Sequence, residues 1–452
     1  MVKQMKNTIL YFTVAAVLFT STLISAKVTD EQAKQLGQNL TPMGAEKAGN
    51  KDKTIPAWDG GITQPIAGYV RGEHHPDPYA NEKPLFKIQQ NNMDDFSDKL
   101  SEGQKALLSK YSSLYFNVYP SHRSTAYPQK VYDAVRKNAT TAELDDNGNG
   151  VKNSEISIPF PVPSNALEVL WNHILRYRGE NLLRKSYSAA VDSKGGFVPV
   201  LSEDKVLFNY AQGGETSHEL MLAIIQRTLE PTRLAGGITL AKEAVNQAKS
   251  PRQAWAYNKG QRRVRRAPTF GYDAYQPGTD GLRTIDEFDM FNGSPDRYDW
   301  KLLGKKELYI PFNNYKAHSA EAKIDVLMHE RHLNPEYLRY ELHRVWVIEA
   351  TLKEGKRHVY AKRVFFLDED SWQITIAESY DKRGELWRVA EGLSINYYEK
   401  PIQQYVLELN YDLKANRYYV GGMHNGLPPV NFDVSHALKD FRPTVIQRLG
   451  VQ

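Results

Sequence analysis

Apolar and polar residues alternate along much of the chain after about residue 180, and this period of two predicts β-strands. The cleanest run is YVLELNYDL, residues 405–413, with Tyr405, Leu407, Leu409, Tyr411 and Leu413 on one face. Residues 342–352 and 356–367 form two further runs around KEG, a short hairpin turn. Consecutive strands joined by short turns predict an antiparallel meander, so we expect a long-stranded curved sheet or an unclosed β-barrel.

Helical spacing occurs in three earlier stretches, which makes the expected class α+β, with helices at the concave face of the sheet. The first stretch runs from Phe96 to Tyr111, and the second lies around Val131 and Val135. The third, residues 164–178, is the clearest: Ser164 is placed to cap it and Gly179 to end it. Its apolar stripe includes Leu167, Leu170, Trp171 and Ile174. This helix either simply packs on the sheet or lines a ligand cavity with those four side chains.

The first 26 residues have the features of an export signal. Lys3 and Lys6 precede the apolar stretch 9–19, and ISA at 24–26 is a plausible cleavage site. An uncleaved membrane anchor is the alternative. Residues 27–90 are rich in proline and glycine, and we expect them to form an irregular arm anchored by Trp58, Tyr69, Tyr79 and Phe86. The predicted organisation is therefore a signal (1–26), an arm with short helices (27–160) and an open-barrel domain (161–452).

Charge and cysteine content narrow the possible partners. The chain of 452 residues has a formal charge of +5, and removal of the signal leaves +3 over 426 residues. Nucleic-acid-binding proteins usually carry a concentrated basic excess, so we expect no nucleic acid partner. The chain has no cysteine, so it contains no disulfide and cannot be a lipoprotein acylated on cysteine.

One concentrated basic run does occur, GQRRVRRAP at residues 260–268. On a strand, Arg262, Val264 and Arg266 share one face, and Arg263 and Arg265 share the other. Neither face is apolar, so such a strand cannot cross the centre of a core. The favoured interpretation is pairing with the acids of TIDEFDMF, residues 284–291, which we predict to be a strand. The alternative is a cationic rim that holds phosphate or carboxylate headgroups through Arg262, Arg263, Arg265 and Arg266.

Motifs for catalysis or metal binding are weak. DDNGNG at 145–150 begins like a calcium loop, but its twelfth position is Ile156, so we expect a plain turn. HERH at 329–332 lacks the spacing of zinc proteases, and the pair His74 and His75 is weak evidence for a metal.

The remaining candidates for catalysis are also weak. DED at 368–370 could present paired catalytic carboxylates, but we expect solvated acids in a hairpin turn. Ser202 and Lys205 match a Ser-x-x-Lys pattern that is short enough to occur by chance. We therefore predict no catalytic residue, no metal and no cofactor.

Long blocks of the sequence resemble a known family. They include LTPMGAEKAGNKDKTIPAWDGGIT, GQRRVRRAPTFGYD, FNGSPDRYDWKLLGKKELYIPFNNY and ELHRVWVIEATLKEGKRHVYAKRVFFLDEDSWQI. The chain is similar through them to a Gram-negative family of unknown function often labelled outer-membrane lipoprotein-sorting-like. The resemblance implies the fold of the LolA and LolB lipoprotein carriers, an unclosed antiparallel barrel with helices in its mouth. It also implies that the protein is periplasmic or associated with the outer membrane, together with outer-membrane proteins and efflux-type transporters. No catalytic residues are established for the family, so the resemblance implies none here.

These observations lead us to expect a periplasmic, non-enzymatic carrier or binding protein for a lipid or other hydrophobic ligand. Sheltering an acyl chain of roughly sixteen carbons from water is worth on the order of ten kcal/mol, at about 0.8 kcal/mol per CH₂. A carrier would need an apolar hollow for that chain. The alternative is an adaptor that links an outer-membrane protein to an inner-membrane transporter, and a hydrolase of envelope glycans or lipids is a third option.

Overall fold

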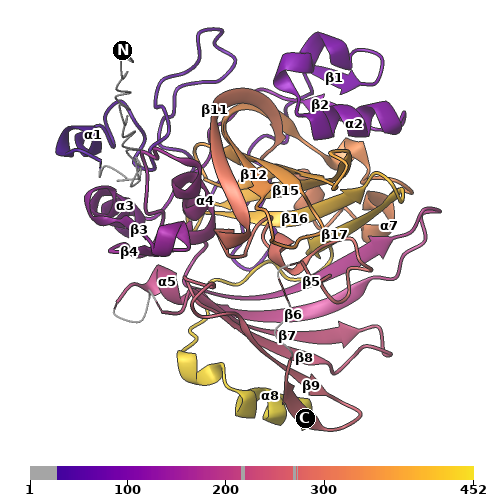
Figure 1. Cartoon of the computed structure of the whole chain (residues 1–452). Coiled ribbons are helices and arrows are strands. Elements are labelled where there is room, and N and C mark those ends of the chain that lie inside the picture. The colour runs from indigo at the N-terminus through magenta and orange to yellow at the C-terminus, as the bar shows by residue number, and fades with distance from the viewer. Residues whose placement is uncertain (1–27, 215–218, 268–270, 272, 452) are drawn as a thin grey trace, which may run out of the picture.

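One large sheet dominates the structure, a computed structural model that describes residues 28–214, 219–267, 271 and 273–451 (Figure 1). The sheet has 15 strands in the order β1-β2-β12-β13-β14-β15-β16-β17-β5-β6-β7-β8-β9-β10, and β11 pairs with β12 along its whole length. Its pairings are antiparallel except for a single parallel contact between β2 and β12. In the described residues β10 pairs only with β9, so the sheet does not close. The predicted α+β class with an unclosed antiparallel sheet is confirmed.

The strands have the following bounds: β1 Phe86–Gln89, β2 Tyr115–Val118, β5 Asn181–Val191, β6 Val200–Leu207, β7 Leu222–Glu230, β8 Ile238–Glu243, β9 Gln253–Asn258, β10 Arg263–Arg266, β11 Tyr298–Pro311, β12 Tyr340–Leu352, β13 Lys362–Asp368, β14 Ile374–Tyr380, β15 Leu386–Tyr397, β16 Ile402–Asp412 and β17 Arg417–Met423. A separate hairpin joins β3 (Glu143–Asp145) and β4 (Gly150–Lys152). Asp146 and Asn147 turn this hairpin with positive φ, so DDNGNG is a turn, as expected.

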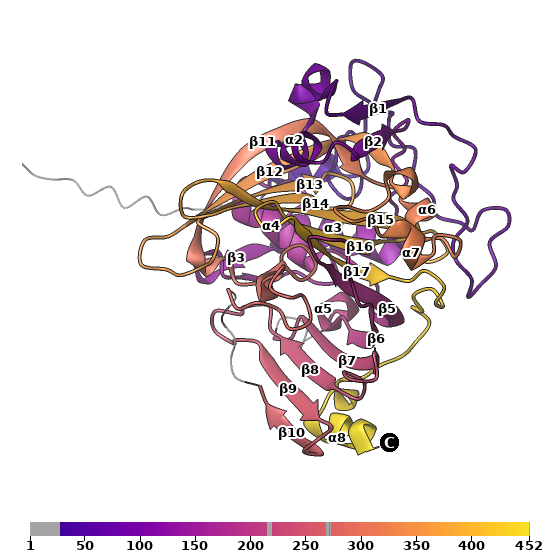
Figure 2. The same ribbon diagram turned by 90° about the vertical axis from the view of Figure 1, so that its right-hand side faces the viewer.

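The α-helices are α1 Asp30–Lys34, α2 Glu102–Lys110, α3 Gln129–Thr141, α4 Ala166–Leu175, α5 Asn209–Gln212, α6 Tyr315–His318, α7 Ile324–Leu327 and α8 Pro443–Val451. Short 3₁₀ helices are η1 Met93–Lys99, η2 Asp146–Gly148, η4 Ile285–Glu287, η5 Pro295–Arg297, η6 Pro335–Tyr337 and η7 Leu438–Asp440. Two helices cover the sheet at different places. Helix α4 packs against β11 and β12, and α8 packs on β8, β9 and β10 at the far end (Figure 2).

The three predicted helical stretches all exist, but their ends differ from expectation. The first divides into η1 and α2, because Ser101 starts a new helix with a capping box to Gln104. In α4 the cap is Asn165, whose side chain accepts from the backbone N–H of Glu168, and Ser164 instead donates to the Glu168 carboxylate. Helix α4 stops at Arg176, before Gly179, because Arg176 turns into an extended conformation and its guanidinium pairs with Asp289.

The prediction of a strand at residues 284–291 is wrong. This segment contains η4, and its acids pair with partners that are distant in the sequence. Asp286 pairs with Arg363 (2.9 Å) and accepts from His358, whereas Asp289 pairs with Arg176 and Arg178. The favoured pairing of the arginine run with these acids is therefore wrong as well, because the acids are already committed inside the molecule.

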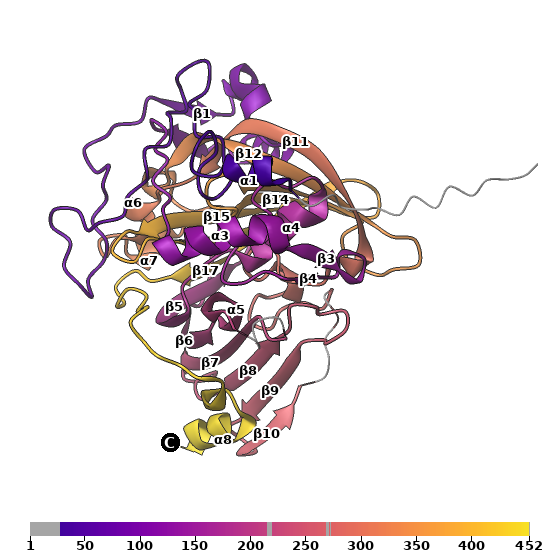
Figure 3. The same cartoon turned by 90° about the vertical axis from the view of Figure 1, so that its left-hand side faces the viewer.

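The N-terminal arm is irregular, as predicted. After α1 it contains no helix or strand before β1, and it crosses one end of the sheet as a series of turns (Figure 3). Tyr69 lies edge-on to Tyr398, and Phe86 stacks on Phe96, so two of the expected anchors are in place. Within the part of the chain that the structure describes, no helix is long and apolar enough to cross a membrane. The predicted export signal lies outside the described residues.

Candidate functional site

A cleft of about 790 Å³ opens between the arm and the loops at one end of the sheet. We call it the arm cleft. It is lined by residues of four segments, 68–82, 313–321, 337–339 and 427–429, and by Tyr119. Its volume lies in the range of roughly 300–1,000 Å³ that is usual for small-molecule sites. The arm thus forms one wall of this cleft.

The arm wall is fixed mainly by its histidines. His75 is buried, and its Nε2 lies 2.6 Å from Oε2 of Glu399, while its ring packs against Tyr397 and Tyr398. His74 lies beside it, with Nε2 2.8 Å from the carbonyl oxygen of Leu427. These contacts join the arm to residues more than 320 positions later in the chain.

A charged network holds the lower part of the arm. Glu82 accepts from Arg339 Nη2 (2.8 Å) and lies 2.6 Å from His122 Nε2. Tyr79 stacks on the His122 ring, with ring centroids 3.9 Å apart. Arg339 also donates from Nε to Glu341, so this buried guanidinium is neutralised on two sides. Arg339 lies over the rings of both Tyr79 and Tyr119. A ligand in the cleft would therefore meet aromatic surface and not a free cation.

The cleft lining combines aromatic rings with unpaired acids. Tyr79, Tyr119, Tyr315 and Tyr337 supply rings, and Pro76, Pro428 and Pro429 supply further apolar surface. No described cation lies within ion-pair distance of the Glu73, Asp77 or Glu321 carboxylates. Burial raises the pKa of Asp77, in part opposed by the N–H of Tyr79 that donates to it. Lys316, the other cation of the lining, donates to the carbonyl of Glu336. The uncompensated charge of the cleft is negative.

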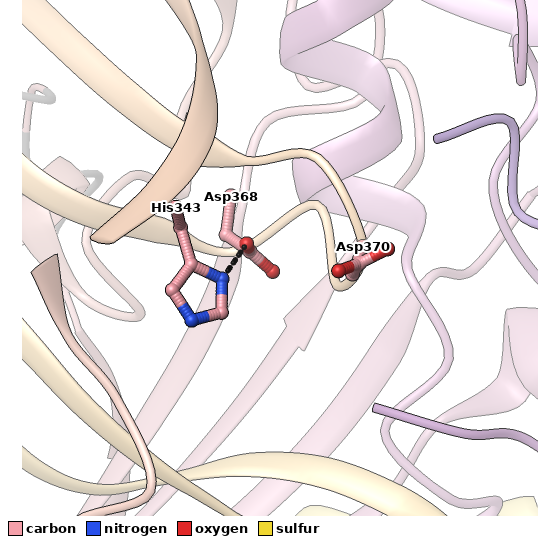
Figure 4. Close-up of side chains that lie close together, drawn as sticks. All are labelled: His343, Asp368 and Asp370. Carbon is pink, nitrogen blue, oxygen red and sulfur yellow. Dashed lines mark hydrogen bonds and ion pairs between the residues drawn. The ribbon is translucent and has the colours of Figure 1, made fainter. Parts of the chain in front are cut away.

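His343, Asp368 and Asp370 form a second cluster, whose ligand atoms lie within 4.8 Å of one another (Figure 4). All three side chains already have strong partners. Asp370 receives two hydrogen bonds from Arg123, at 2.8 and 2.7 Å, and Asp368 Oδ2 accepts from the N–H and the hydroxyl of Ser371. The His343 ring lies between Asp368 Oδ1 (3.1 Å) and Glu341 Oε2 (3.3 Å). With its acids balanced by cations, this cluster is a structural ion network.

The expectation of solvated acids at residues 368–370 is accordingly wrong. Asp368, Glu369 and Asp370 are at most 4% exposed, because the arm covers this turn. Glu369 pairs with Arg344 (3.0 Å) and Lys305 (2.8 Å), and the backbone N–H of Glu46 in the arm also approaches it. These acids hold the arm on the sheet and are not open to a substrate.

The helix predicted to line a cavity, α4, is buried in the main core. Leu170, Trp171 and Ile174 are at most 3% exposed, and Trp171 Nε1 donates to the carbonyl of Gly148. Leu167 is half-buried and packs over Gly148. The hollow that remains nearby, between β5, β6, β7 and β16, is about 30 Å³ and has Arg178, Arg184 and Asp289 in its wall. That space suits one or two water molecules and not an acyl chain.

The arginine run lies at the open edge of the sheet, away from the arm cleft (Figure 2). Arg263, Arg265 and Arg266 are in β10, and Arg262 lies in the preceding turn with φ 51°. The register places Val264 opposite Tyr257 and Arg266 opposite Trp255, so the predicted strand exists over Arg263–Arg266, whereas the strand face predicted for Arg262 is wrong because Arg262 lies in the turn. All four arginines are exposed, and none forms an ion pair with a described residue.

The sequence analysis missed most of the residues that line the arm cleft. They come from four segments spread over 360 positions, and none of these segments carries a recognised motif. The available signal was the density of aromatic and proline residues in the arm. It indicated that the arm is anchored, but it did not identify the segments on which the arm packs.

Comparisons with known proteins fit the family resemblance. A family profile described as a protein of unknown function (DUF1329) matches residues 87–447. An uncharacterized protein of Pseudomonas aeruginosa is 44% identical over 455 residues, covering 99% of this chain and 100% of that protein.

Similar solved structures share 13–15% identity with this chain. A domain from Vibrio parahaemolyticus, assigned to outer-membrane lipoprotein sorting, gives a TM-score of 0.41 over 59% of this chain and 92% of the domain. A DUF1329 protein from Desulfovibrio piger gives 0.40 over 59% and 92%, and a LolA superfamily protein from Nitrosomonas europaea gives 0.37 over 62% and 98%.

Proposed function

The chain belongs to the DUF1329 family of proteins of unknown function, and we propose that it is a periplasmic, non-enzymatic binding protein or carrier for an amphipathic ligand. The observation that carries this proposal is the arm cleft, an open hollow of about 790 Å³ with aromatic walls and uncompensated acids. The ligand we propose has an apolar body and a cationic group.

The chemistry of the lining supports this choice of ligand. Tyrosine rings and prolines shelter apolar surface, which is worth about 25 cal/mol for each Å² removed from water. A cation gains from the carboxylates of Glu73, Asp77 and Glu321. An anionic headgroup would instead meet three acids against one cation without a carboxylate partner, Lys316, because Arg339 is already paired with Glu82 and Glu341.

The packing of the concave face limits where a carried ligand could bind. A lipid enclosed beneath α4 would need a hollow many times larger than the 30 Å³ that is present. We therefore place the ligand at the arm cleft, where its apolar part lies against the open aromatic wall rather than inside the sheet.

A matched pair of ligands tests the proposal. Octyltrimethylammonium and octanesulfonate have the same chain length and opposite charge, and their binding to the full chain can be measured by calorimetry below the micellar range. We expect the cation to bind more tightly, and we expect the double variant Glu73→Gln, Asp77→Asn to remove that preference. Glu354→Gln, at an exposed position in a distant turn, is the control. Equal binding of both compounds, unaffected by the double variant, would contradict the proposal.

A second function, an adaptor in an envelope transport complex, is favoured by the β10 edge. This strand has no strand neighbour on its outer side in the described structure, where the Gln447 side chain of α8 contacts the Val264 N–H and the Arg262 carbonyl. The four exposed arginines in and beside the strand suit an acidic partner segment. The variant with all four arginines changed to alanine should keep its stability within about 0.5 kcal/mol, since these side chains contact little. It should also lose a partner that the unchanged chain retains in pull-downs from envelope extracts, and full retention would count against the adaptor.

A further inference from the structure

Three histidines from parts of the chain that are far apart in sequence meet behind the wall of the arm cleft, and His74 alone belongs to the cleft lining. His74 is in the arm, His318 ends α6, and His424 follows β17. The ring centroids of His74 and His318 are 4.9 Å apart, and those of His318 and His424 are 5.5 Å apart. This cluster is separate from the network around His343.

The hydrogen bonds of the two outer rings leave one nitrogen of each with a free lone pair. His74 Nε2 lies 2.8 Å from the carbonyl oxygen of Leu427, and His424 Nδ1 lies 2.8 Å from the carbonyl oxygen of Lys185. A carbonyl only accepts, so the contacting nitrogen carries the proton. The other nitrogens, His74 Nδ1 and His424 Nε2, are buried and have no hydrogen-bond partner. Histidines that bind metals commonly show this arrangement, with the second ring nitrogen donating to a carbonyl.

The central ring is the unusual one. His318 is 1% exposed, and neither of its ring nitrogens has a hydrogen-bond partner. A buried imidazole without hydrogen-bond partners is costly to keep, and a ligand that satisfies it would stabilise the fold.

The backbone around His318 is fixed in place. Asn425 donates from Nδ2 to the carbonyls of Ala317 (2.9 Å) and Ser319 (3.1 Å), the two residues that flank His318. The same loop supplies His424 and the Leu427 carbonyl that holds His74. One short loop therefore orients all three rings.

We propose that His74, His318 and His424 bind a zinc ion, with the fourth position left to a water molecule. Zinc sites that keep an open position commonly use three protein ligands, and imidazole nitrogen is a preferred ligand of zinc. With Zn–N bonds of about 2.0–2.1 Å and tetrahedral angles, ring centroids of two histidine ligands lie about 5 Å apart. The two observed centroid distances, 4.9 and 5.5 Å, match this spacing.

Binding requires one local adjustment. The ligand nitrogens of the three histidines do not all lie within 4.8 Å of one another, as those of His343, Asp368 and Asp370 do. His318 has no hydrogen bond that would resist rotation of its ring, so its rotation can bring a nitrogen to the ion.

Titration of the full chain with zinc tests the site directly. After treatment with a chelator and dialysis, we expect one zinc ion per chain by calorimetry and a rise in Tm when zinc is added. Cobalt in place of zinc should give the visible absorption of a tetrahedral site. A chain that binds no zinc would overturn the proposal.

Variants locate the ion. His318→Phe keeps the ring volume and should weaken zinc binding by more than about 100-fold, since even outer partners of ligands are worth roughly 10–100-fold. His74→Ala, on the half-buried arm, removes a ligand with little risk to folding and should also weaken binding, whereas His329→Gln, an exposed control, should not. Unchanged binding in both ligand variants, or loss of binding only in His343→Gln, would overturn the proposal. The zinc measurement needs no amphipathic ligand, so its outcome is independent of the proposed function.

Discussion

At the scale of single residues, some buried ionisable groups have partners of opposite charge and others have none. Glu391 lies inside the sheet with only the Tyr340 hydroxyl as a partner, at 3.2 Å from each oxygen. Burial raises its pKa to about 7, and the Tyr340 hydroxyl lowers it only in part. The folded chain therefore holds a proton here that the unfolded chain releases at a lower pH.

This difference makes stability fall as the pH rises. Between the unfolded pKa of 4.5 and the folded pKa of about 7 the native state binds the extra proton, so the free energy of unfolding decreases over this window and levels off above it. Glu391→Gln should remove up to about 3 kcal/mol of that decrease, making the variant more stable than the parent at pH 8. Urea unfolding at pH 5 and pH 8 measures the effect. Glu349→Gln, nearer the surface of the same sheet, is the control, and an equal slope in parent and Glu391→Gln would contradict the account.

His343 shows the opposite balance. Burial lowers its pKa, but hydrogen bonds to Asp368 and Glu341 outweigh burial and raise the pKa to about 9. The stabilisation by its charged ring is complete below the unfolded pKa of 6.5 and is lost as the pH rises through about 9. His343→Phe should lower the free energy of unfolding by about 3–5 kcal/mol at pH 6, because it leaves the buried Asp368 carboxylate without its cationic partner.

The cost of His343→Phe should shrink toward pH 10, where the ring is neutral in the parent as well. Thermal unfolding of both proteins at pH 6 and pH 10 tests this dependence. A difference that stays constant with pH would mean that packing, and not charge, sets the role of His343.

At the scale of elements, local patterns predicted the strands and helices well and failed where a distant partner decides. Residues 405–413 alternate because one face of β16 packs among apolar side chains and the other, also mostly buried, carries Glu408, Asn410 and Asp412, and that signal is contained in the segment itself. Residues 284–291 combine apolar and acidic residues without strict alternation, and Arg363 and Arg176, more than 70 and 110 positions away, hold their acids in a compact loop. Such pairings over long separations leave no trace in a single sequence.

Helix α8 illustrates a signal that was present and overlooked. Val445, Ile446 and Leu449 follow the helical spacing after Pro443 and bury one face on β8–β10 with Tyr257 and Phe441. Without this cover the apolar face of these strands would be open to water.

We predict that Ile446→Ala detaches α8 in part. Ile446 is fully buried, and truncation of such a side chain costs about 2–5 kcal/mol. Amide hydrogen exchange should become faster in β8, β9 and β10 and stay unchanged in β12–β16. Leu438→Ala, which is 36% exposed, should change neither region. Equal protection of β8–β10 in parent and Ile446→Ala would show that α8 is not their cover.

At the scale of the whole molecule, the expected curved and unclosed sheet exists, but the protein's own side chains fill its concave side. The sequence indicates the curved sheet and the amphipathic α4, yet it cannot show that Arg176, Arg178 and Asp289 fill the space beside them. The volume of a cavity depends on how all elements pack together, whereas hydrophobic periodicity in the sequence describes one element at a time. The arm cleft was unpredictable for the same reason.

The arm is a structural part of this whole and not a detachable appendage. Replacing residues 68–82 by a Gly/Ser segment of equal length removes the His75–Glu399 and Glu82–Arg339 contacts and uncovers Tyr397 and Tyr398. We expect the free energy of unfolding to fall by at least about 3 kcal/mol, which urea unfolding measures. An unchanged free energy of unfolding would mean that the arm does not stabilise the fold and is instead available to bind partners.

The attachment of the arm to residues 399–433 also determines when the chain can complete its fold. His75, His74 and Arg71 have their partners at Glu399, Leu427 and Asp433, so an early part of the chain depends on a late one. Contacts with such separations close slowly. During synthesis from the N-terminus, residues 71–75 therefore cannot reach their native contacts until residues 399–433 are available.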